Sequence, residues 1–179
     1  MRRQFAARAL AVAGLLVAAS ARPAEIVDGT SRPVRLLRSW EESVKAPNGS
    51  EYVRRVDLVF DYERGFAQER YSSGAAGLVY GTRDIKQSQP SPSTEEIAEA
   101  FDLIRQDAEL GRIVARRNIV LEGGFILEEG RRKRCGPGSR CLQIQLLSPD
   151  RTGLVRWTVV DLVKRQIAYP VFVPRGLRP

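Results

Sequence analysis

Residues 93–111, STEEIAEAFDLIRQDAELG, carry the clearest structural signal in the chain. Ser93 and Glu96 have the spacing of a capping box, in which each side chain satisfies a backbone N–H at the start of a helix. Apolar side chains then recur at i, i+4, i+7 and i+11, on one helix face: Ile97, Phe101, Ile104 and Ala108. Gly111 is expected to end the helix. The segment therefore predicts an amphipathic helix that packs against other elements through its apolar face.

The residues before this helix predict a β-hairpin. Apolar and polar residues alternate over 56–62, as they do in a half-buried strand. Residues 63–65 (ERG) form a turn with glycine at the position of positive φ, and the chain returns over 66–71. Further upstream, the spacing of apolar residues favours a short helix over 34–44.

The residues after the helix predict strands to the end of the chain. These strands are expected at 119–128, 142–146, 154–162 and 167–173. Gly123 and Gly124 indicate a bulge or bend in the first of them. The whole pattern predicts an α+β fold: one amphipathic helix packed on an antiparallel sheet, with an N-terminal β-hairpin region.

The predicted domain organisation follows from these segments and from the linker 87–93 (QSQPSPS), where prolines exclude helix. We expect four parts, with a sub-boundary of the third at the linker: a cleaved export signal at 1–21, an irregular segment at 22–50, a single α+β domain at 51–173 and a tail at 174–179.

The start of the chain resembles a bacterial export signal. Arg2, Arg3 and Arg8 precede an apolar run over 9–19, and small residues follow at the expected cleavage site after Ala21. The run is too short to span a bilayer, so the protein is expected not to be transmembrane. The paired arginines fit twin-arginine export, while general secretion and a buried N-terminal helix remain alternatives. The expected location is periplasmic or secreted.

Charge is distributed unevenly along the chain. Residues 22–110 carry 12 basic and 16 acidic side chains, whereas residues 111–179 carry 14 basic and 5 acidic ones. A basic half is typical of proteins that bind anions, but export argues against nucleic acid. The expected partners are therefore an acidic protein or an anionic membrane surface.

The sequence contains no histidine. This excludes Ser-His-Asp and Cys-His catalysis and imidazole metal sites. The cysteines and scattered carboxylates form a poor ligand set for zinc or copper. We therefore expect a protein that is not an enzyme, with no catalytic residues, no metal and no cofactor.

Cys135 and Cys141 enclose turn-forming residues between two predicted strands. In an oxidising compartment this arrangement favours a structural disulfide. A dithiol redox site and a metal site are the alternatives, although redox pairs usually have a two-residue spacing at a helix N-terminus.

Basic residues cluster around this cysteine pair. The expected partner-binding residues form one constrained tip: Arg131, Arg132, Lys133, Arg134 and Arg140. Such a tip could dock an acidic protein or membrane headgroups. The alternative is a solvated loop that keeps the protein soluble.

Two segments within 94–169 resemble the non-catalytic amino-terminal appendage domains of copper amine oxidases. They are EEIAEA (95–100) with LIR (103–105), and RWTVVDL (156–162). The resemblance implies a cystatin-like outline and an accessory role, and it transfers no functional residue.

Together these observations predict an exported, non-catalytic interaction protein that docks an acidic partner through its basic C-terminal half. The alternative is a periplasmic carrier of a small apolar or anionic ligand. Docking by surface arginines should weaken with ionic strength, whereas binding of a buried apolar ligand should not.

Overall fold

The computed structural model describes residues 34–73, 77–86 and 88–174. The predicted export signal at 1–21 and the last five residues of the predicted tail lie outside the described residues. Within the described residues, no helix is both long enough and apolar enough to cross a membrane.

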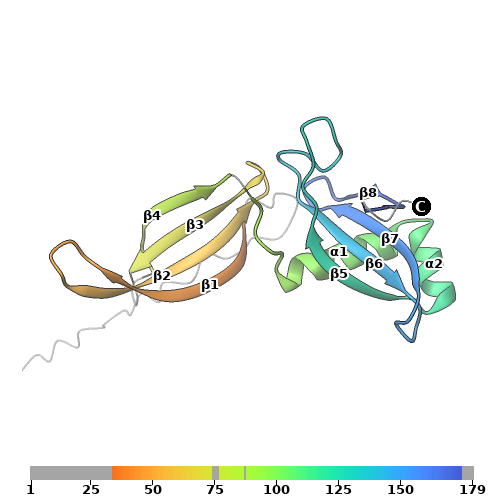
Figure 1. The fold of residues 1–179 in the computed structure, drawn as a ribbon, viewed down its shortest axis with the longest axis horizontal. Helices are drawn as coiled ribbons and strands as arrows, with labels where there is room; N and C mark the ends of the chain where they lie inside the picture. Colours follow the sequence, from red (N-terminus) through yellow and green to blue (C-terminus); the bar gives the residue numbers. More distant parts are fainter. Residues whose placement is uncertain (1–33, 74–76, 87, 175–179) are drawn as a thin grey trace, which may run out of the picture. The chain divides into compact units, whose positions relative to one another are not determined.

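The first half of the described chain forms an antiparallel meander (Figure 1). Its four strands lie in chain order in the sheet: β1 (Val34–Lys45), β2 (Glu51–Asp61), β3 (Phe66–Ser73) and β4 (Val79–Ile85). The predicted hairpin is confirmed, because β2 and β3 pair across a turn in which Gly65 has a φ of 69°.

The helix predicted over 34–44 is wrong, because these residues belong to β1. A register shift lies between Leu36 and Arg38 in the pairing of β1 with β2. Beyond this bulge, Trp40, Glu42 and Val44 are half-buried while the residues between them are exposed. A bulge changes the face on which later residues lie, so Leu37 and Trp40 are both half-buried although an odd number of positions separates them. The bulged strand therefore imitates helical spacing.

The second half forms two helices and a second meander. The helices are α1 (Thr94–Gln106) and α2 (Leu110–Arg117). The strands again lie in chain order: β5 (Val120–Ile126), β6 (Cys141–Leu147), β7 (Leu154–Asp161) and β8 (Gln166–Tyr169). The bulge or bend predicted at Gly123 and Gly124 is confirmed, because the register of β5 and β6 shifts between Gly123 and Phe125.

The capping box is confirmed at the start of α1, but the predicted end of the helix is wrong. The chain leaves helical geometry at Asp107, whose ψ is 136°, and its carboxylate accepts hydrogen bonds from the backbone of Glu109 and Leu110. Gly111 lies inside α2, where an added Cβ would lie 2.2 Å from the carbonyl oxygen of Arg105. Glycine is required there by the close approach of the two helices.

The predicted fold of one helix on a single sheet is also wrong. The structure is mostly β, with two four-stranded antiparallel sheets and two short helices among the described residues. The hairpin strands pair with β1 and β4, and no strand of this sheet pairs with the other sheet. Pro90 and Pro92, between β4 and α1, interrupt regular backbone hydrogen bonding there.

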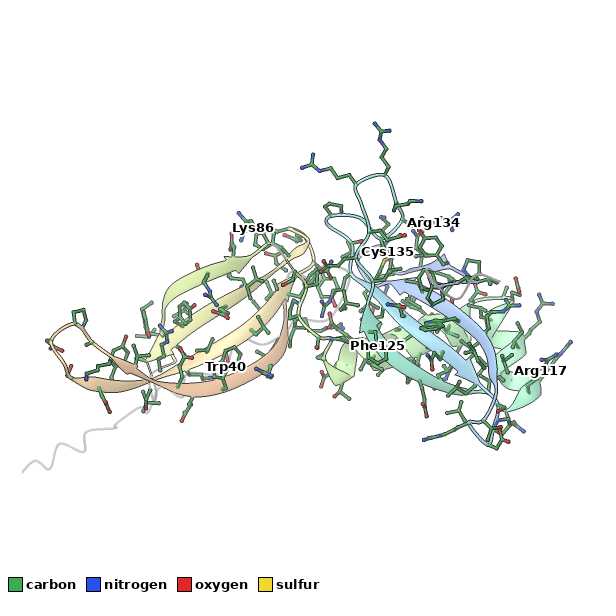
Figure 2. All side chains as sticks on the ribbon, in the orientation of Figure 1. Trp40, Lys86, Arg117, Phe125, Arg134 and Cys135 are labelled. Carbon is green, nitrogen blue, oxygen red and sulfur yellow. A yellow bond between two sulfur atoms is a disulfide. The ribbon has the colours of Figure 1, made fainter. Side chains whose placement is uncertain are left out.

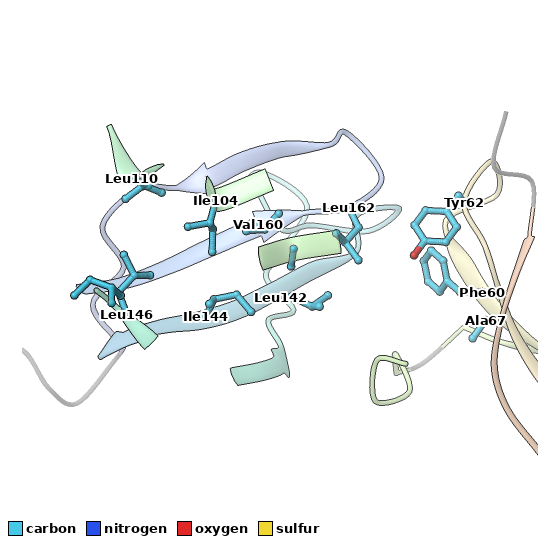
Figure 3. Close-up of a cluster of buried hydrophobic side chains, with 12 residues drawn as sticks. Phe60, Tyr62, Ala67, Ile104, Leu110, Leu142, Ile144, Leu146, Val160 and Leu162 are labelled. Carbon is cyan, nitrogen blue, oxygen red and sulfur yellow. The ribbon is translucent and has the colours of Figure 1, made fainter. Parts of the chain in front are cut away.

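One apolar core involves both halves (Figure 3). Leu142, Ile144 and Leu146 project from one face of β6 and are fully buried, together with Ile104 of α1 and Leu110 of α2. Three residues of the β2–β3 hairpin extend the same cluster: Phe60 of β2, Tyr62 of the turn and Ala67 of β3. The β2–β3 hairpin of the first sheet therefore packs against the second half of the chain through this cluster.

Asp150, in the turn between β6 and β7, is expected to make part of the protein's stability sensitive to acid. Hydrogen bonds from the side chains of Ser148 and Thr152 lower the pKa of Asp150 to about 2. A lowered folded-state pKa contributes stability above the unfolded pKa and loses it as pH falls through the folded value. We expect an Asp150→Asn variant to lose less stability than the unmodified protein between about pH 4 and pH 2, measured by urea unfolding. Parallel losses would contradict this.

Candidate functional site: a basic groove beside the disulfide loop

The predicted disulfide is present. Cys135 and Cys141 are bonded, with their Cα atoms 5.7 Å apart, and both are buried. The loop they close lies between β5 and β6 (Figure 1). Backbone hydrogen bonds also join Leu127 to Cys141 and Glu129 to Cys135. The bond and these contacts hold the base of the loop at the end of the paired strands β5 and β6.

The disulfide should contribute measurably to stability. A short closed loop predicts a contribution of about 2.4 kcal/mol from the lost entropy of the unfolded chain. We therefore expect a Cys135→Ser, Cys141→Ser variant to unfold at a lower urea concentration. Reduction of the unmodified protein with dithiothreitol should reproduce the loss, and it should not affect the variant. A variant as stable as the unmodified protein would contradict this role.

Four of the five predicted partner-binding residues are exposed: Arg131, Arg132, Lys133 and Arg134. The first three lie in the β5–β6 connection just before the disulfide, outside the loop that it closes. Their side chains make no hydrogen bond or ion pair with any described residue. Arg134, at the base of the loop (Figure 2), donates a hydrogen bond of 2.6 Å to the carbonyl oxygen of Ala168 and lies over the ring of Tyr169. Arg134 therefore ties the loop to β8.

The prediction that Arg140 belongs to the exposed cluster is wrong. The Arg140 side chain is fully buried and pairs with the equally buried Glu96 of α1, with Nη2 2.8 Å from Oε2 and Nε 3.0 Å from Oε1. It also donates to the carbonyl oxygen of Pro90 and lies over the ring of Phe60. Burial of an arginine requires such a complete set of partners.

Glu96 receives two further hydrogen bonds. The backbone N–H of Ser93 donates to Oε2 at 3.0 Å, which completes the capping box. The hydroxyl of Tyr62 donates to Oε1 at 2.5 Å. Burial and the carboxylate of Glu96 raise the pKa of Tyr62 far above its ordinary value, so this hydroxyl stays protonated. The network therefore joins the β2–β3 turn, the linker, α1 and the disulfide loop.

A groove of about 1000 Å³ lies between the exposed cations and the segment that follows β8. Leu127, Tyr169 and Phe172 supply apolar surface, and Val171 and Val173 extend it. The opposite side carries charged side chains: Glu128, Glu129, Arg131, Arg132 and Lys133. The groove thus combines an apolar wall with a basic one.

The two acidic residues of the groove have partners within the protein. Glu128 accepts a hydrogen bond from the backbone N–H of Gln89, and Glu129 accepts one of 2.6 Å from the hydroxyl of Tyr169. Burial and the hydrogen bond to Glu129 raise the pKa of Tyr169. The carboxylates are held by these contacts, whereas Arg131, Arg132 and Lys133 have no such contact with a described residue.

Sequence reasoning missed the apolar wall of the groove. Tyr169 and Phe172 were expected as part of one strand over 167–173. In the structure β8 ends at Tyr169, and Phe172 beyond it keeps a backbone hydrogen bond to Trp157 of β7. Pro170 was the available signal, because proline favours the end or edge of a strand. Among the described residues there is no group of three side chains suited to hold a metal ion.

Comparison of the chain with protein-family models and with curated proteins finds no match.

Proposed function

We propose that this chain is an exported, non-catalytic interaction protein that docks an acidic partner through the basic wall of the groove. The observation that carries the proposal is the set of three exposed cations, Arg131, Arg132 and Lys133, which have no partner among the described residues. The disulfide and the backbone hydrogen bonds of Glu129 and Lys133 fix the backbone beside these cations, so docking would mainly order their side chains. The role requires no cofactor and no catalytic residue.

Three further observations support the proposal. The leader-like sequence at 1–21 supports export to the periplasm or beyond. The disulfide supports an oxidising compartment. The excess of basic residues after 110 supports attraction of acidic surfaces over a distance.

Affinity capture with a charge-reversed variant tests the proposal. The protein is immobilised and exposed to periplasmic extract at low salt, beside an Arg131→Glu, Arg132→Glu variant. The matched control is Arg116→Glu, Arg117→Glu, because both control residues are exposed in the last turn of α2. We expect a retained acidic protein, identified by mass spectrometry, that the loop variant loses and the control keeps. Equal retention by both variants would refute docking through this loop.

Ionic strength provides a second test of the same proposal. Exposed charges attract one another across about 10 Å at about 0.1 M salt and much less at higher salt. Retention should therefore fall steeply as salt is raised. Vesicles of phosphatidylglycerol are the parallel probe, because binding to them with the same salt dependence would identify an anionic membrane surface as the partner.

A carrier of a small apolar or anionic ligand is the second candidate. The groove volume of about 1000 Å³ and its apolar wall favour this candidate. Native mass spectrometry of protein purified from its own cells tests it directly. A bound small molecule that survives high salt would favour the carrier over the docking protein.

A further inference from the structure

The apolar wall of the groove is exposed to an extent that distinguishes among occupants. Val171 is 60% exposed and Val173 is 47% exposed, although both line the groove. A small apolar ligand is usually enclosed over most of its surface. An open groove of this kind is instead suited to a bound peptide chain, of which it would contact one side.

Contacts with β7 and β8 nevertheless fix the position of the apolar wall. The backbone N–H of Phe172 donates a hydrogen bond of 2.7 Å to the carbonyl oxygen of Trp157 in β7. The Phe172 ring packs against the rings of Trp157 and Tyr169, with centroids 6.2 and 5.8 Å away. Phe172 is thus anchored toward the sheet, while Val171 and Val173 remain available to another molecule.

The basic wall carries three cations at consecutive positions, 131–133, while its two carboxylates, Glu128 and Glu129, already accept hydrogen bonds within the protein. A ligand with one carboxylate would pair with one of these cations and leave the others unpaired. A chain with several carboxylates could pair with all of them, while an apolar side chain contacts the opposite wall. Charge complementarity therefore favours a polyacidic chain over a single headgroup.

We propose that the groove binds an acidic peptide segment of the partner protein, whose carboxylates face Arg131, Arg132 and Lys133 and whose apolar or aromatic side chain rests on Val171 and Val173. This inference rests on the proposed function and adds to it the nature of the docked segment. An aromatic side chain suits the role of anchor because it buries a large area with little loss of side-chain entropy.

Fluorescence anisotropy with three labelled heptapeptides tests the inference on the full chain. The probes are DEDFDED, the anchor-free DEDADED and the charge-reversed KKKFKKK. We expect DEDFDED to bind at least about tenfold more tightly than DEDADED, which corresponds to the transfer of one aromatic side chain to partly apolar surroundings. KKKFKKK should not bind. Equal binding of DEDFDED and DEDADED would overturn the inference, because the apolar wall would then contribute nothing.

Polar substitutions in the apolar wall locate the anchor. A Val171→Asn, Val173→Asn variant should weaken DEDFDED binding about fivefold to tenfold and leave DEDADED binding unchanged. The matched control is Val53→Asn, Val79→Asn, since these valines of the first sheet are 52% and 53% exposed. Urea unfolding of both variants verifies that they fold. Unchanged binding by a folded wall variant would overturn the inference.

The two proposals fail in different ways. If the partner protein is captured through Arg131 and Arg132 but binding of DEDFDED does not depend on the valines, docking stands and the peptide inference falls. If charge reversal at Arg131 and Arg132 affects neither capture nor peptide binding, both fall. Binding of oleate at high salt, measured by native mass spectrometry, together with no binding of DEDFDED, overturns the peptide inference in favour of a small amphiphile.

Discussion

An Arg140→Met variant is expected to lose about 3–5 kcal/mol of unfolding free energy, because removal of one member of a buried ion pair leaves an uncompensated charge. The side chains of Arg140 and Glu96 have no solvent exposure. Arg140 also donates a hydrogen bond to the carbonyl oxygen of Pro90 and lies over the ring of Phe60. Loss of the guanidinium would leave the Glu96 carboxylate with only the hydrogen bonds from Tyr62 and Ser93. Urea unfolding monitored by circular dichroism measures the effect.

A second substitution separates the cost of the orphaned charge from the value of the pair. An Arg140→Met, Glu96→Leu variant removes both charges, so it should recover a substantial part of the lost stability. Arg105→Met is the surface control, since Arg105 is 54% exposed and its contacts are with Asp102 and the ring of Phe101, both on the same helix. Its expected effect is below about 1 kcal/mol. A loss of that small size for Arg140→Met would contradict a structural role for the buried pair.

A Gly65→Ala variant is expected to lose about 3 kcal/mol, from backbone strain and from a clash. Gly65 lies in the β2–β3 turn with a φ of 69°, which alanine adopts only with strain. An added Cβ would lie 2.5 Å from the Cα atom of Gly138 in the disulfide loop. Backbone atoms cannot move aside as a flexible side chain can, so the turn and the loop would have to separate. Thermal and urea unfolding measure the loss.

Gly49→Ala is the matched control for this variant. Gly49 has a φ of 84° in the β1–β2 turn, and an added Cβ would meet nothing within 4 Å. It should therefore lose only the strain component of about 1–2 kcal/mol. Equal losses for the two alanine variants would show that the contact between Gly65 and Gly138 contributes nothing to stability.

Features that depend on neighbouring residues could be predicted from the sequence. The capping box joins Ser93 to Glu96, and the turn at Gly65 closes a hairpin between adjacent strands. The disulfide joins two cysteines six positions apart. In each case the interacting groups lie close along the chain, so residue type and spacing carry most of the information.

Two predictions were wrong because a local pattern has more than one structural interpretation. The apolar spacing around Trp40 is compatible with a helix, and only pairing with β2 shows a strand with a bulge. Gly111 is compatible with a helix end, and only the approach of Arg105 shows why glycine lies inside α2. Secondary structure at such positions depends on contacts between elements.

The candidate site could be predicted in part. The sequence predicted one exposed cluster of five cations, and four of them are exposed while Arg140 is buried. The role of the cluster in docking stays a prediction. The groove itself could not be predicted, because its apolar wall comes from Tyr169 and the residues after it. No spacing rule connects this segment with the loop.

The sequence by itself determined the start of α1, the two-residue alternation of most strands, the cysteine pair and the basic character of the C-terminal half. Only the tertiary structure decided that the strands form two sheets, and that Arg140 is buried while Arg131 is exposed. The physical reason is that the free energy of a charged side chain depends on its surroundings more than on its neighbours in sequence. Arg140 is buried because Glu96, 44 residues away, and Pro90 supply the partners that water would otherwise provide.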